Sequence, residues 1–138
     1  MIRAELATQL MICVNDKVGT LAEVTTMISA SRINMTAICA YAVEGTVAIM
    51  FVTEDNNEAR KLLEARKYSV RAEEVILLTL DNKPGALQTV TDKLAEAGIS
   101  LKLIYGSVTK ENSNSRIILI SDNNLDAMMI IKTEMERS

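Results

Sequence analysis

The sequence contains an internal repeat, and this feature limits the folds that the chain can adopt. The segment "NDKVGTLAEVTTMISASRI" at residues 15–33 aligns with "DNKPGALQTVTDKLAEAGI" at residues 81–99. The identical pairs are Lys17/Lys83, Gly19/Gly85, Leu21/Leu87, Val24/Val90, Thr25/Thr91, Ile33/Ile99 and Ile38/Ile104. With one residue inserted, "DNN" at residues 55–57 also aligns with "DNN" at residues 122–124. Two copies are too few for a solenoid, so the repeat indicates a duplicated domain.

Both copies predict the same order of elements. An apolar run of strand length comes first, then a turn with a glycine, then a one-sided apolar stripe that is typical of a helix. A second strand, a polar turn, a third strand and a second helix follow. The predicted ranges after the first helix are 34–43, 47–53, 57–66 and a final strand 68–72 in the first copy, and 100–108, 116–121 and 124–134 in the second. The opening strands are 9–14 and 75–80.

This order predicts an α+β fold of two tandem ferredoxin-like βαββαβ units, each an antiparallel sheet with its helices on one face. We expect domains at residues 1–73 and 74–138, without a flexible linker between them. The second copy ends before a fourth strand, so residues 75–80 would lie at an open apolar edge, which favours pairing. Three segments could cover that edge: residues 2–8, residues 68–72, or another chain, and the last favours a homodimer.

Charge and composition argue against several classes of partner. The chain has a net charge of −3, with no run of Lys or Arg, and it contains one Phe and three Tyr. Nucleic-acid binding needs a basic surface, and RNA binding on this order of elements needs aromatic side chains on the middle strands. The sequence has no apolar stretch long enough for a transmembrane helix. We therefore expect a cytoplasmic protein that binds neither nucleic acid nor membranes.

The chain has no histidine, which is the most common general base and metal ligand. Its two cysteines, Cys13 and Cys39, each lie in an apolar run that predicts a strand, and we interpret them as buried, reduced thiols. A redox or metal-binding role is the alternative. No paired acid and base stand out, so we expect no catalytic residue, no cofactor and no metal site, which argues against an enzyme on the same fold.

The pattern D-x-P-G-x-L-x-x-V-x-x-x-L-x-x-x-x-I-N/S, which both copies follow in large part, resembles that of the ACT domain. The resemblance extends over nearly the whole chain, which is similar to stand-alone tandem ACT proteins without a catalytic domain. It implies a regulatory protein that binds an amino acid between two ACT domains, near the turn before the first helix. The free N–H groups at the start of a helix favour a carboxylate, and a glycine lets the ligand approach the backbone closely.

The resemblance also implies which residues contact the ligand. They are Asn82, Lys83, Pro84, Gly85, Ala86 and Leu87 in the second turn, Asp16, Gly19 and Thr20 in the first turn, and Asn34, Met35 and Ser100 at the second strands. Serine-binding ACT domains have an Asn three residues before the glycine and another Asn on the second strand. Only Asn82 with Asn34 retains both amides, so we expect that site to be the competent one. Asp16 with Ser100 is less suitable, because Asp16 would repel a ligand carboxylate unless Lys17 offsets that charge.

Each of these residues has a simpler interpretation as well. Gly19 and Gly85 are suited to a tight strand-to-helix turn without any ligand. Asn82 and Asp16 are residue types preferred as helix N-caps. Asn34 could have no role beyond starting a strand, and the lysines of the turns could be solvated.

Two functions follow from the resemblance. The first is a non-catalytic sensor or regulator that binds an amino acid at the interface between ACT domains. The alternative is a regulatory subunit of an amino-acid biosynthetic enzyme, similar to that of acetolactate synthase, which would act through contact with a catalytic chain.

Overall fold

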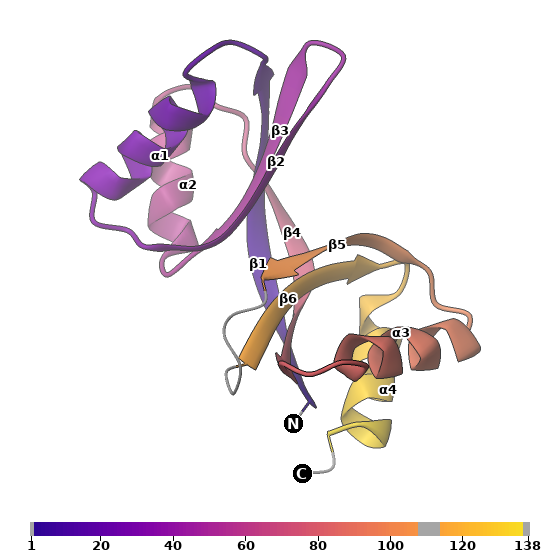
Figure 1. The fold of residues 1–138 in the computed structure, drawn as a ribbon. Coiled ribbons are helices and arrows are strands. Elements are labelled where there is room, and N and C mark those ends of the chain that lie inside the picture. The colour runs from indigo at the N-terminus through magenta and orange to yellow at the C-terminus, as the bar shows by residue number, and fades with distance from the viewer. Residues whose placement is uncertain (1, 108–113, 137–138) are drawn as a thin grey trace. The chain divides into compact units, whose positions relative to one another are not determined.

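A computed structural model describes residues 2–107 and 114–136 of the chain. Its elements are β1 (Ile2–Asn15), α1 (Thr20–Ala30), β2 (Met35–Val43), β3 (Thr46–Thr53), α2 (Asn56–Ala65), β4 (Arg71–Asp81), α3 (Ala86–Glu96), β5 (Leu101–Ser107), β6 (Asn114–Ser121) and α4 (Asn124–Glu134) (Figure 1). The predicted α+β class and the two ferredoxin-like units are confirmed. The predicted end of a strand at residue 108 lies outside the described residues.

Two strands are longer than predicted. The predicted strands 68–72 and 75–80 are not separate, because β4 runs without interruption from Arg71 to Asp81. Only Glu73 and Glu74 separate the two predicted runs, and no glycine or proline is present to end a strand there. The predicted strand 9–14 likewise begins much earlier, at Ile2.

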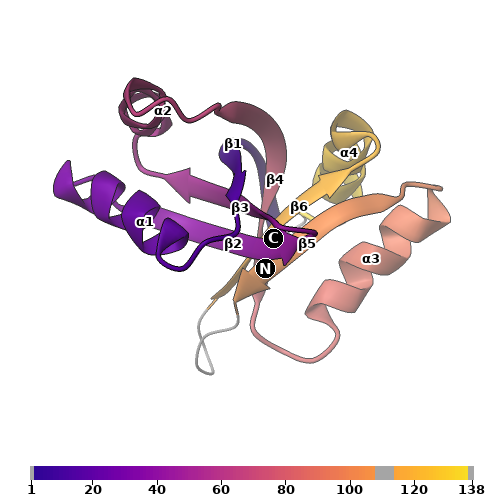
Figure 2. The ribbon, with the colours of Figure 1, turned by 90° about the horizontal axis from the view of Figure 1, so that it is seen from above.

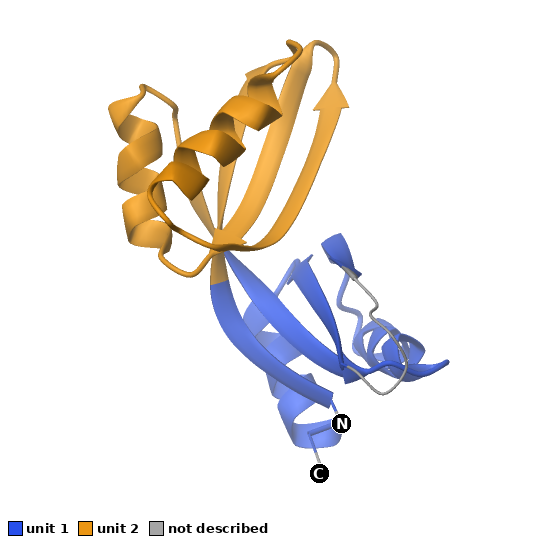
Figure 3. Cartoon of the chain, turned by 60° about the vertical axis from the view of Figure 1, so that its left-hand side comes forward, with its two compact units in different colours: residues 1–7, 74–138 blue, residues 8–73 orange. Residues whose placement is uncertain are grey.

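The chain forms two compact units (Figure 3). Unit 2 is Thr8–Glu73, which is the first copy of the repeat. Unit 1 is Glu74–Ser138, which is the second copy, together with Met1–Ala7. The sequence-based division at residue 73 places residues 2–7 with the first copy, whereas in the structure they belong to unit 1.

In unit 2, strand β3 lies between β2 and β1, and both pairings are antiparallel. Helices α1 and α2 lie on one side of these strands (Figure 2). The core forms where the apolar stripes of the helices meet alternate residues of the strands. Its buried members are Leu10, Ile12, Val24, Ile28, Ile49, Phe51, Ala59, Leu63 and Val70.

In unit 1, the strand order is β1, β4, β6 and β5, and helices α3 and α4 lie on one side of the sheet (Figure 2). Only the first residues of β1 belong to this unit. The buried core is Ala4, Ile76, Leu78, Leu80, Ala86, Val90, Leu94, Ile117, Leu119, Ala127, Met128 and Ile131.

The second copy has no fourth strand of its own in the described residues, because α4 is its last element. The predicted open edge at residues 75–80 is nevertheless wrong. The N-terminal residues of β1 lie beside β4, and Ala4 on this strand is 1% exposed within the unit 1 core. Of the three predicted candidates, the N-terminal segment of the same chain covers the edge.

The interpretation of both cysteines as buried is also wrong. Cys13 is exposed and Cys39 is half-buried, and both are free thiols. Cys13 pairs with Ala48, whose neighbour Ile49 belongs to the core under the helices. Because successive side chains of a strand point to opposite faces, Cys13 lies on the face away from the helices.

Within the described part of the chain, no helix has the length and apolar character that are needed to cross a lipid bilayer.

Candidate functional site

The turn before α3 connects the end of β4 to the start of the helix in four residues. Gly85 is the N-cap of α3, with φ 87° and ψ −9°. This left-handed conformation is unfavourable for residues with a Cβ atom, which explains the glycine. The backbone N–H groups of Lys83 and Ala86 donate to the carbonyls of Asp81 (3.0 Å) and Lys83 (3.3 Å), and these bonds hold the turn closed.

The turn before α1 has the same geometry in unit 2. Gly19 is the N-cap, with φ 91° and ψ −3°. The backbone N–H of Thr20 donates to the Lys17 carbonyl (3.2 Å), and its hydroxyl donates to the same oxygen (3.0 Å). The aligned glycines therefore have the same backbone role, as the repeat predicts.

Neither α1 nor α3 has a hydrogen bond from a side-chain cap, whereas the other two helices do. The side chains of Asp55 and Asn123 accept from backbone N–H groups at the starts of α2 and α4, each at 3.1 Å. The interpretation of Asp16 and Asn82 as N-caps is therefore wrong, because the glycines occupy that position. The helix starts that follow the two glycine turns can thus accept an anion from outside the helix.

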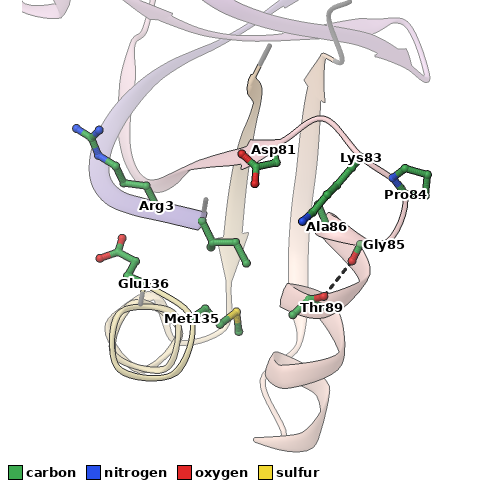
Figure 4. A pocket seen from close by; sticks show the side chains of 10 residues that line it. Arg3, Asp81, Lys83, Pro84, Gly85, Ala86, Thr89, Met135 and Glu136 are labelled. Carbon is green, nitrogen blue, oxygen red and sulfur yellow. Dashed lines mark hydrogen bonds between the residues drawn. The ribbon is translucent and has the colours of Figure 1, made fainter. Parts of the chain in front are cut away.

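A cavity of about 580 Å³ lies beside the second turn, within unit 1 (Figure 4). Four segments supply its walls: the start of β1, the end of β4, the turn with the first residues of α3, and the residues that follow α4. The lining residues are Ile2, Arg3, Asp81, Lys83, Pro84, Gly85, Ala86, Thr89, Met135 and Glu136. Figure 4 shows the Lys83 side chain folded back toward the start of α3.

The wall of the cavity carries charges of both signs. Arg3 and Lys83 are cationic, and Asp81 and Glu136 are anionic. A carboxylate oxygen of Glu136 accepts a hydrogen bond from the Ala4 backbone N–H, which joins the N-terminal strand to the end of α4. The second carboxylate oxygen pairs with Nζ of Lys132 at 3.3 Å.

In the first turn, the structure brings fewer of the predicted residues to a cavity. Gly19 contributes to a hollow of about 430 Å³. Its other lining residues are Ala22, Glu23, Thr26, Met27 and Ala30 of α1, and Arg66 after α2. Neither Asp16 nor Thr20 lines this hollow.

Asn34 and Ser100 occupy equivalent places immediately before β2 and β5. The side-chain amide of Asn34 donates to Glu54 Oε1 (3.2 Å), and the backbone carbonyl of Asn34 accepts from the Glu54 backbone N–H (3.0 Å). The Ser100 backbone N–H donates to Asp122 Oδ1 (3.3 Å), and the Ser100 carbonyl accepts from the Asp122 backbone N–H (2.9 Å). Both residues are exposed, and the partnership of Asn34 with the Asn82 turn stays a prediction.

Comparison with known families identifies the fold. A family model described as an ACT domain pair matches residues 6–136. The chain belongs to the ACT domain pair family. The resemblance seen in the two glycine turns is thereby confirmed, and it extends over both units of the ACT pair.

Solved structures agree with this assignment. The crystal structure of protein BT0572 from Bacteroides thetaiotaomicron is similar to this ACT pair, with a TM-score of 0.86 and 26% identity over 94% of this chain and 88% of that chain. The ligand-free regulatory subunit of aspartate kinase from Thermus thermophilus has a TM-score of 0.66 at 15% identity, over 96% of this chain and 98% of that chain. At that identity the likeness shows the fold alone. A comparison with curated proteins found no match.

Of the predicted ligand contacts in the ACT pair, the unit 1 cavity brings together Lys83, Pro84, Gly85 and Ala86. The sequence-based prediction missed Ile2, Arg3, Asp81, Thr89, Met135 and Glu136. Thr89 could have been found, because it follows Gly85 by one helical turn and its hydroxyl donates to the Gly85 carbonyl (3.0 Å). The residues near the two chain ends carry no such local signal.

Proposed function

We propose that this ACT pair is a non-catalytic regulatory protein that binds a small ligand, an amino acid, at its glycine turns. The observation that carries the proposal is the pair of helix starts whose N-caps are left-handed glycines, which make no side-chain cap hydrogen bond. A ligand carboxylate would supply that acceptor and would also be favoured by the helix dipole. Charges of both signs around the second turn suit a zwitterion.

The proposed site combines the second turn with Asn34 of a neighbouring ACT domain, in the same chain or in a second chain. Its contacts are Asn82 to Leu87 with Asn34 and Met35. The corresponding site with Asp16, Gly19, Thr20 and Ser100 would bind more weakly, because the Asp16 carboxylate repels that of the ligand.

Calorimetric titration of two single variants with amino acids tests this asymmetry. Asn34→Ala should weaken binding about tenfold, the cost of roughly one hydrogen bond to a charged group. Asp16→Ala should leave the affinity unchanged or slightly improved. Equal losses in the two variants would refute the asymmetry.

A thermal-shift screen of the wild-type protein against the twenty amino acids tests the proposed function itself. A ligand that binds only the folded state raises the free energy of unfolding by about 2.7 kcal/mol at 100 times its Kd. No shift with any amino acid, together with no heat of binding, would overturn the proposal.

We further propose a homodimer that pairs through the apolar edge strand β2. This strand, MTAICAYAV, carries no charged residue, and Tyr41 and Val43 are 50% and 52% exposed. Exposed, uncharged edge strands are prone to pair with another chain.

The free thiols of Cys13 and Cys39 suit a reducing compartment, in keeping with a cytoplasmic protein.

The alternative is a regulatory subunit of an amino-acid biosynthetic enzyme. The same β2 edge would then contact a catalytic chain, and the regulatory subunit of aspartate kinase from Thermus thermophilus, named above, shares the fold. Affinity purification of the full chain from its own cells distinguishes the two. A catalytic chain in stoichiometric amount would support the subunit, whereas a pure homodimer would support the independent sensor.

A further inference from the structure

We propose that unit 1 holds an amino-acid site of its own, the 580 Å³ cavity between the second turn, the N-terminal strand and the end of α4. The ligand would be a zwitterionic amino acid with an apolar side chain. The inference shares the ligand class with the proposed function, but its site lies within one unit and does not use Asn34.

The two units can be compared residue by residue at the end of their second helices. The backbone N–H of Tyr68 donates to the Leu63 carbonyl at 3.0 Å, and the backbone N–H of Glu136 donates to the Ile131 carbonyl at 3.0 Å. The starts of the same helices give the same alignment. The side-chain oxygens of Asn56 and Asn124 each accept from the backbone N–H of the residue three positions earlier. Tyr68 and Glu136 are therefore equivalent, which moves the "DNN" alignment by one residue.

A second equivalence lies on the first helices of the units. The backbone N–H of Glu23 donates to the Gly19 carbonyl (2.9 Å), and that of Thr89 donates to the Gly85 carbonyl (3.1 Å). Glu23 and Thr89 thus occupy the same place in the first turn of α1 and α3.

In unit 2 these two positions are joined. The Tyr68 hydroxyl donates to Glu23 Oε1 at 2.9 Å, and the ring of Tyr68 packs against the unit 2 core. A large side chain and its hydrogen bond therefore connect the first helix to the residues after the second helix. In unit 1 the equivalent Thr89 and Glu136 are two walls of the cavity. The first copy of the repeat thus joins these two positions by a hydrogen bond, whereas in the second copy both positions line the cavity.

The chemistry of the wall defines the ligand. The Lys83 ammonium, close to the start of α3, would bind a carboxylate. A carboxylate group has about four lone-pair sites, so Glu136 can accept from a ligand ammonium besides the Ala4 N–H and the Lys132 ammonium. Ile2, Pro84 and Met135 supply apolar surface for a side chain. A ligand with only one of the two charges would form only one of these two contacts.

Binding in this cavity would also stabilise the N-terminal strand. Ile2 and Arg3 form one wall, and the adjacent Ala4 N–H bonds to Glu136 on another. A bound ligand that touches both walls should slow amide hydrogen exchange in residues 2–7 and 83–89. Binding at the Asn34 site would slow exchange near residues 34–37 and in the shared second turn, but not in residues 2–7.

The test introduces the hydrogen-bonded residue pair of unit 2 at the equivalent positions of unit 1, with the double variant Thr89→Glu/Glu136→Tyr. Thr133→Glu, the same change at an exposed position of α4 outside the cavity, is the matched control. The probes are L-valine, L-leucine, L-isoleucine and L-methionine, with 4-methylpentanoate and 3-methylbutylamine as the leucine analogues that lack one charge. Calorimetry gives the affinity, and hydrogen exchange of the wild type gives the location.

We expect the wild type and Thr133→Glu to bind at least one of these amino acids equally well. The double variant should lose at least tenfold in affinity, and each leucine analogue should bind at least tenfold more weakly than leucine. Unchanged binding by the double variant, or no added protection of residues 2–7 in the wild type, overturns this site while the proposed function stands. No binding of any of the twenty amino acids by the wild type overturns both. Because hydrogen exchange is measured on the wild type, the test does not depend on the folding of a variant.

Discussion

At the residue scale, Gly85 has the backbone conformation that most limits substitution in the second turn. Its φ of 87° is unfavourable for any residue with a Cβ atom, although no atom lies within 4 Å of the position that a Cβ would take. Gly85→Ala should therefore lower the free energy of unfolding by about 1–2 kcal/mol through backbone strain alone. Urea denaturation measures this loss.

Gly85→Asn is the matched control for that substitution. Asn tolerates the left-handed region better than Ala, so it should recover part of the loss. If Ala and Asn destabilise the protein equally, backbone conformation is not the cause.

Tyr68 is the residue whose hydrogen bond distinguishes unit 2 from unit 1. Burial first, and then the hydrogen bond to Glu23 and its negative charge, raise the pKa of Tyr68 above its ordinary value of 10.0. A raised pKa in the folded state means that the neutral phenol is the form that folding favours. Its contribution to stability is therefore complete below pH 10 and is lost as the pH rises through the pKa of the folded state.

Tyr68→Phe should lower the free energy of unfolding at pH 7 by about 0.5–1.5 kcal/mol, the usual value of one hydrogen bond. It should also reduce the loss of stability above pH 10. Denaturation curves of the wild type and the variant at pH 7 and pH 10.5 measure both effects. An unchanged pH profile would show that the Glu23 contact does not stabilise the fold.

At the scale of elements, β1 is the strand on which both units depend. Its first residues complete the sheet of unit 1, and its later residues pair with β3 in unit 2. Around Ala4 the exposure alternates, because Ala4 is buried between the exposed Arg3 and Glu5. This alternation is what a strand with one covered face requires.

Ala4→Asp tests whether this strand is needed. A carboxylate at a position that is 1% exposed has no cationic partner in the unit 1 core, so the variant should lose about 3 kcal/mol or more. Thermal unfolding measures the loss. Leu6→Asp, on the same strand at a position that is 47% exposed, should cost far less. Similar losses in both variants would show that the N-terminal residues do not dock on β4.

At the scale of the whole molecule, the apolar β2 edge bears on assembly. Tyr41→Lys places a charge near the end of this strand, where it would have to be desolvated on pairing with a second chain. We expect the dissociation constant of the proposed homodimer to rise at least tenfold, as measured by light scattering across a concentration series. Ser29→Lys on the exposed surface of α1 is the control, and a wild type that remains a monomer contradicts the proposal.

The sequence by itself determined the elements, their duplication and the two glycine turns. These features can be predicted locally, because apolar periodicity and the need for a left-handed glycine each involve only a few consecutive residues. Only the tertiary structure decided that residues 2–7 cover β4 and that Glu136 lies across a cavity from Thr89. These residues are far apart in the chain and come together only through packing, such as that of Ala4 in the unit 1 core. A sequence pattern that spans a few residues does not predict such contacts. For the same reason the two copies share the turn, yet only the tertiary structure revealed that Tyr68 bonds to Glu23 in unit 2, whereas the equivalent residues of unit 1 line a cavity.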